Sequence, residues 1–131
     1  MMSIRSLAGA CLSACVALGA FAVPASAQNY PTRTITMIVP FAAGGPTDVI
    51  SRIVTAHMAQ TLGQSIVIEN VVGAGGTTAT TRAARAANDG YTLVTGHMGT
   101  HAASVPLYPK LAYHPEKDFE PVALLAGTPI R

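Results

Sequence analysis

One loop of this sequence could bind an anion through its backbone. The segment Phe41-Ala-Ala-Gly-Gly-Pro-Thr-Asp48 follows a short apolar run and precedes a stretch with helical periodicity. A glycine loop that leads into a helix favours a bound anion, because backbone N–H groups and the helix dipole point at it. The candidate donors are the N–H groups of Gly44, Gly45 and Thr47, and we expect a positive φ at Gly45. The alternative is that the glycines only form a tight strand-to-helix turn, and the loop alone favours neither.

A second candidate is the loop from Gly96 to His101, which also follows an apolar run. His97 and His101 are four residues apart and could share one helix face, as metal ligands do. No third ligand is evident, since Glu69 and His114 belong to no recognisable motif. A capping or ligand-edge role for His101 is therefore favoured over metal binding, and we expect no metal site.

The loop Gly73 to Gly76 suggests a dinucleotide-binding turn, but that fingerprint needs a sixth-position glycine where this chain has Thr78. No G-x-S-x-G elbow exists, and Ser51, Ser65 and Ser104 have no visible histidine–carboxylate partners. The acidic residues are too scattered for a paired-carboxylate hydrolase. We therefore expect neither catalytic residues nor a cofactor.

Short strands and helices must hold these loops. Pro46 suits a first helical turn, Asp48 places a carboxylate there, and Gly63 suits the helix end. The order strand, glycine loop, helix predicts an α/β fold with a parallel sheet and crossover helices, whose loops share one ligand-binding edge. The expected strands cover 34–40, 65–69, 91–95 and 122–126, and the helices cover 46–62, 77–87 and a short piece near residue 100.

The first 27 residues are predicted to be a secretory signal peptide. A basic residue precedes the apolar run Leu7 to Val23, and a small-x-small motif ends at Ala27. We expect cleavage after Ala27, which leaves Gln28 as the N-terminus and places the protein in the periplasm. An uncleaved anchor is disfavoured by the short apolar run. Lipidation at Cys15 is disfavoured because apolar residues follow it where a polar tether would be expected.

The mature composition limits the classes of partner. Both cysteines, Cys11 and Cys15, lie in the signal, so the mature part can form no disulfide and no thiolate metal site. Its 104 residues carry seven basic and six acidic side chains, a net charge of +1, with no basic cluster. Nucleic acid is therefore not an expected partner.

Four blocks in order resemble the solute receptors of tripartite tricarboxylate transporters, also called the Bordetella uptake family. The first block begins at Tyr30-Pro31 and runs through the loop that ends at Asp48. The remaining blocks are Leu62-Gly-Gln64 with Val67-Ile-Glu-Asn70 and Gly73-Ala-Gly-Gly76; Asp89-Gly-Tyr-Thr-Leu93 with Gly99-Thr-His-Ala102; and Asp118-Phe-Glu-Pro-Val122 with Leu124-Leu-Ala126. Each block alone is weak, whereas the ordered set covers essentially the whole mature chain.

The resemblance implies a non-catalytic Venus-flytrap receptor of two lobes. Such a receptor binds small carboxylates in its cleft, delivers them to a membrane permease, and is expected to be a monomer at full length. The family holds the ligand carboxylate largely through backbone groups and waters of the first and third loops. The ligand-binding residues that this implies are Phe41, Ala43, Gly44, Gly45, Thr47, Asp48, Gly96, Gly99, Thr100 and His101.

The chain departs from the family pattern at two points. Val71 and Val72 replace the usual arginine and proline of the second block. The chain is also far shorter than family members, so we expect residues 28–131 to be an incomplete N-terminal lobe with the second lobe absent. The alternative interpretations are a truncated, non-functional copy and a fragment of a periplasmic α/β enzyme.

Overall fold

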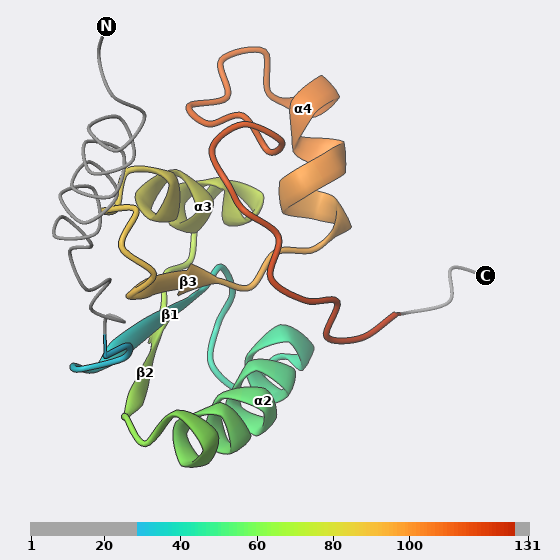
Figure 1. Cartoon of the computed structure of the whole chain (residues 1–131). Helices are drawn as coiled ribbons and strands as arrows, with labels where there is room; N and C mark the ends of the chain where they lie inside the picture. The colour runs from blue at the N-terminus through green and yellow to red at the C-terminus, as the bar shows by residue number, and fades with distance from the viewer. Residues whose placement is uncertain (1–28, 128–131) are drawn as a thin grey trace, which may run out of the picture.

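Strands and helices alternate along the chain in the computed structural model, which describes residues 29–127. The predicted signal peptide lies outside the described residues. Figure 1 shows the elements in their order along the chain. They are β1 (Ile35–Val39), α2 (Pro46–Leu62), β2 (Ile66–Asn70), η1 (Ala74–Gly76), α3 (Thr77–Ala84), β3 (Thr92–Val94), η2 (Gly99–Ala103) and α4 (Ser104–Leu107).

The three strands form one parallel sheet in the order β2-β1-β3. Met37 of the central strand pairs with Ile68 on one side and with Leu93 on the other. Helix α2 packs on β1 and β2, and α3 packs on β1 and β3 from the opposite side of the sheet (Figure 1). This order is that of doubly wound sheets, whose ligand crevice lies outside the carboxyl ends of β1 and β3. The predicted α/β fold with a parallel sheet is confirmed.

Strand β1 supplies most of the core. Ile35, Ile38 and Val39 are buried, because helices cover the central strand on both faces. A parallel strand that is buried on both sides needs a continuous apolar run rather than alternation. Ala79 of α3 is also buried, and its small side chain lets the helix approach the sheet.

Helix α2 follows its predicted limits. Pro46 lies in its first turn, and Gly63 ends it in the left-handed conformation at φ 66°. The residues that α2 buries are polar, namely Asp48, Ser51 and Thr55. The apolar stripe of the helix is open instead, and Ile53 is 58% exposed. An open groove follows this stripe and is lined by Ile53, Val54, His57, Met58, Thr61 and Leu62.

Two predicted elements differ from the structure. The expected strand at 122–126 is wrong, because these residues pair with no strand in the described part of the chain and Leu124 is 91% exposed. An apolar run forms a strand only where a sheet edge accepts its hydrogen bonds. Helix α3 ends at Ala84 rather than at residue 87, because the N–H of Ala86 bonds Ala83 O in a tighter turn. A short helix near Thr100 is confirmed, as η2 and α4 run through 99–107.

A polar clasp closes the amino ends of the strands. Arg33 pairs with Asp89 at 2.7 Å and lies 3.8 Å from the ring centroid of Tyr91. The Tyr91 hydroxyl lies 3.2 Å from Thr32 Oγ1 and accepts a hydrogen bond from the N–H of Thr32 at 2.9 Å. The side-chain contact, and then the backbone bond, lower the pKa of Tyr91. The clasp fixes the chain before β1 at the end of the sheet opposite the predicted ligand edge. Across residues 29–127, no helix is long and apolar enough to cross a membrane.

Candidate functional site

Asp48 anchors the first loop from within. Its Oδ2 accepts hydrogen bonds from the N–H of Gly44 and from Arg52 Nε, both at 2.8 Å. Its Oδ1 accepts from Asn70 Nδ2 at 2.9 Å, and Asn70 also donates to Phe41 O at 2.9 Å. The Arg52 guanidinium and the two other donors hold the pKa of the buried carboxyl far below its ordinary value of 3.8. Asp48 therefore stays ionised and organises the loop.

The donor set of the first loop differs from the one predicted. The Gly44 N–H is bonded to Asp48, and the Gly45 N–H is bonded to Ala42 O at 3.3 Å. Left-handed backbone occurs at Gly44, with φ 82°, whereas Gly45 has φ −74°, so the expected positive φ at Gly45 is wrong. The remaining predicted donor is the N–H of Thr47, in the first turn of α2, which no side chain caps. A helix N-terminus of this kind keeps its attraction for anions.

The third loop is built around His97. The N–H of Gly99 donates to His97 Nδ1 at 2.7 Å, and the N–H of His97 donates to Thr100 Oγ1 at 3.1 Å. The imidazole stacks on the Phe41 ring, with ring centroids 4.8 Å apart and planes 17° from parallel. A side chain of the third loop therefore contacts the first loop directly.

His101 lies deeper in the same loop. Its ring covers the backbone of Gly96, where an added Cβ would lie 2.4 Å from the imidazole Cε1. Its Nδ1 is 2.8 Å from Thr100 Oγ1, and its ring centroid is 5.1 Å from that of Phe119. Burial, and then the nearby His97, lower the pKa of His101 below 6.5. Both effects favour the neutral form of His101, which can take part in hydrogen bonds at the inner side of the loop.

Hydrogen bonds that the sequence did not predict tie the two loops together. Ser51 Oγ donates to Thr47 O at 2.7 Å and lies 2.7 Å from Thr95 Oγ1, and both hydroxyls are buried. Ser51 and Thr95 are 44 residues apart. No local sequence pattern indicates this pairing, because it joins two hydroxyl residues that are distant along the chain.

The second loop packs against the other two. A Cβ built at Gly76 would lie 2.7 Å from Thr100 Cγ2, 3.1 Å from Pro40 Cβ and 3.2 Å from Phe41 Cζ. The backbone of Gly76 therefore lies where the first and third loops meet. The role of Gly76 in this structure is close packing.

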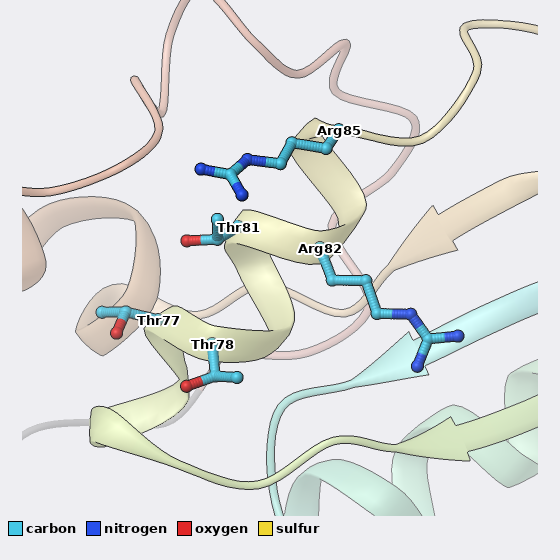
Figure 2. Close-up of a pocket in the computed structure, with 5 residues that line it drawn as sticks. All are labelled: Thr77, Thr78, Thr81, Arg82 and Arg85. Carbon is cyan, nitrogen blue, oxygen red and sulfur yellow. The ribbon is translucent and has the colours of Figure 1, made fainter.

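A separate surface hollow of about 600 Å³ runs along α3 (Figure 2). Arg85 points to one side of the helix and Arg82 to the other, where it pairs with Glu69 of β2. These charges do not converge on one point. The lining residues are Thr77, Thr78, Thr81, Arg82 and Arg85.

The histidine pair gains no third ligand in the described part of the chain. Among residues 29–127, no three histidine, cysteine or acidic side chains gather in a way that could hold a metal ion. Glu69 pairs with Arg82, and His114 Nδ1 accepts a hydrogen bond from the N–H of Glu116 at 3.3 Å.

Known proteins match this arrangement. The family model described as the tripartite tricarboxylate transporter family receptor matches residues 50–131. Protein BugT of Bordetella pertussis is 39% identical over 88% of this chain and 36% of its own length. MatC from Rhodopseudomonas palustris, solved with bound malate, is 66% identical with a TM-score of 0.71 over 73% of this chain and 33% of its own. A second R. palustris protein, solved with adipate, is 39% identical with a TM-score of 0.64 over 66% of this chain and 29% of its own.

The fold and the joined loops define a lobe of the periplasmic-binding-protein type. The chain belongs to the tripartite tricarboxylate transporter receptor family. It spans about a third of the length of the relatives it matches. The predicted family resemblance is confirmed.

Proposed function

We propose that the protein takes part in binding a small organic carboxylate, such as a dicarboxylate, in the periplasm for delivery to a membrane permease. The ligand site is the crevice outside β1 and β3, bordered by the loops 41–48 and 96–101. One observation carries the proposal: the two loops are held together beside the uncapped N-terminus of α2. The Phe41–His97 stack and the Ser51–Thr95 hydrogen bond make this connection. Malate and adipate in two matching structures support the class of ligand.

The charge of the site fits a receptor that binds anions through neutral donors. Arg52 is bonded to Asp48 and Asn70, so its charge is directed into the loop. Asp48 carries the opposing charge and is buried, which keeps it from contacting the ligand. The ligand carboxylate is then held by the N–H of Thr47 and by polar groups of the third loop.

The ten ligand-binding residues predicted from the family fall into two roles under this proposal. Asp48, Gly44, Gly45 and Gly96 shape the loops through internal contacts. The groups that contact the ligand come from Thr47 and His101, with backbone or ring surface contributed by Phe41, Ala43, Gly99 and Thr100.

A chimera tests the function, because this chain spans about a third of its relatives. In the chimera, the matching segment of this chain replaces the aligned segment of the malate-bound R. palustris protein. Calorimetry with malate, adipate and their diamides should show binding of at least one dicarboxylate and of no diamide. Bound ligand should also raise the melting temperature. A folded chimera that binds no carboxylate would contradict the proposal.

The enzyme alternative makes a different prediction. A periplasmic enzyme would convert the carboxylate, whereas a receptor returns it unchanged. Incubation of the chimera with ¹³C-labelled malate and NMR of the products should show malate alone. The truncated-copy alternative predicts that the full chain itself binds nothing, and a titration of the ¹⁵N-labelled full chain with malate checks it.

Export is the remaining part of the proposal. Cleavage after Ala27 would leave an N-terminus at Gln28. Mass spectrometry of periplasmic material should give this N-terminus. An acylated N-terminus at Cys15 would support lipidation instead.

A further inference from the structure

The ligand site needs more hydrogen-bond donors than the backbone of the first loop leaves free. Two of the three backbone donors predicted for the first loop, at Gly44 and Gly45, already have partners within the loop. A carboxylate offers several acceptor positions, and any position that finds no donor in the site weakens its binding. In the loops 41–48 and 96–101, side-chain N–H groups occur only at His97 and His101.

The structure fixes which nitrogen of His97 can donate. The backbone N–H of Gly99 points at His97 Nδ1 at 2.7 Å. An N–H group can only donate, so Nδ1 must present a lone pair. In the neutral ring the hydrogen then lies on Nε2, and His97 is a donor through that atom.

The ring is also held where the two loops meet. It stacks on Phe41 of the first loop at 4.8 Å, while the residue stays exposed to solvent. His101 differs, because its ring is half-buried on Gly96 and beside Phe119. Of the two histidines, His97 is the more exposed, has a fixed tautomer and contacts both loops.

We infer that His97 contacts the ligand, with Nε2–H donating to a carboxylate oxygen of a small dicarboxylate in the crevice outside β1 and β3. The inference rests on the proposed function and adds a residue to its site. The Gly99 bond and the Phe41 stack orient the ring before the ligand arrives, which reduces the ordering that binding requires.

Two substitutions separate the donor from the packing. In His97→Asn, the amide oxygen can still accept from Gly99, but no donor remains at the Nε2 position. In His97→Gln, the amide nitrogen can reach the Nε2 position, but the acceptor for Gly99 is lost. A hydrogen bond to a charged group predicts that His97→Asn weakens dicarboxylate binding by the chimera about ten- to a hundredfold. His97→Gln should bind more tightly than His97→Asn.

A purely structural role predicts the reverse order, since asparagine preserves the Gly99 bond. Unchanged affinity in His97→Asn, or equal losses in both variants, would overturn the inference. Loss of all binding in the unsubstituted chimera would instead refute the proposed function. In the full chain, ¹⁵N NMR of the histidine rings should show the Nε2–H tautomer for His97, and an Nδ1–H tautomer would also overturn the inference.

Discussion

Replacing Gly76 with alanine should strain the point where all three loops meet. Gly76 has φ 91°, a conformation that costs an L-residue about 1–2 kcal/mol. The new Cβ would also lie 2.7 Å from Thr100 Cγ2 and 3.1 Å from Pro40 Cβ, well inside van der Waals contact. Overpacking of this kind costs about 1–3 kcal/mol. We therefore expect Gly76→Ala to lower the free energy of unfolding by about 2–5 kcal/mol.

Gly63 provides the matched control. It has φ 66°, and a Cβ built there meets nothing within 4 Å, so Gly63→Ala carries only the backbone cost of about 1–2 kcal/mol. Urea denaturation of the chimera, followed by circular dichroism, gives both values. Adding Thr100→Ser to Gly76→Ala removes the methyl group at 2.7 Å and should recover part of the loss.

The comparison can refute the packing argument. If Gly76→Ala costs no more than Gly63→Ala, the contacts with Thr100 and Pro40 relax at no cost, and the loops are not packed as described. If Thr100→Ser recovers nothing, the Thr100 methyl group contributes nothing to the strain. A confirmed loss should be accompanied by weaker ligand binding, because Gly76 also lies against Phe41, on which His97 stacks.

Three further outcomes are expected. Ser51→Ala should cost about 1–3 kcal/mol in urea denaturation, since it leaves the buried Thr95 hydroxyl with only the weak acceptor Met37 Sδ at 3.4 Å. Thr61→Ala, at an exposed hydroxyl, should cost little, and equal costs would contradict the role of Ser51. Because the pKa of Asp48 is lowered on folding, its ionised carboxylate contributes fully to stability above pH 3.8, and this contribution is lost as the pH falls below that value. The melting temperature of Asp48→Asn should therefore fall less steeply with acidification than that of the unsubstituted protein. Parallel falls of the two melting temperatures would refute this. A chelator should leave the melting temperature unchanged, and a drop that zinc restores would revive a metal site at the histidine pair.

Features set by neighbouring residues could be predicted from the sequence. The β-branched run of β1, Pro46 at the helix start and Gly63 at its end depend on a few adjacent positions, and the structure confirms them. The order of strands and loops also sufficed to predict a parallel sheet. The 122–126 strand failed because a strand depends on a distant partner, which no local pattern supplies.

The contents of the site depended on contacts that the sequence does not display. The occupancy of the Gly44 N–H follows from the orientation of Asp48, which Asn70 fixes from β2, 22 residues away. The Ser51–Thr95 bond joins α2 to the end of β3. Helix α2 buries polar side chains, whose hydrogen bonds go to backbone carbonyl and N–H groups and to side chains outside this buried set.

The loops 41–48 and 96–101 act as one unit because three contacts of different kinds join them. The buried hydroxyl of Ser51 links the Thr47 carbonyl to Thr95, the ring of Phe41 stacks on His97, and the backbone of Gly76 fills the space between Phe41 and Thr100. A ligand that contacts Thr47 and His97 then meets donors whose spacing is already set, so little ordering is required of the lobe on binding. For the same reason, Ser51→Ala should weaken dicarboxylate binding although Ser51 itself is buried and contacts no ligand. Unaltered affinity in a folded Ser51→Ala chimera would mean that each loop holds its own geometry without the other.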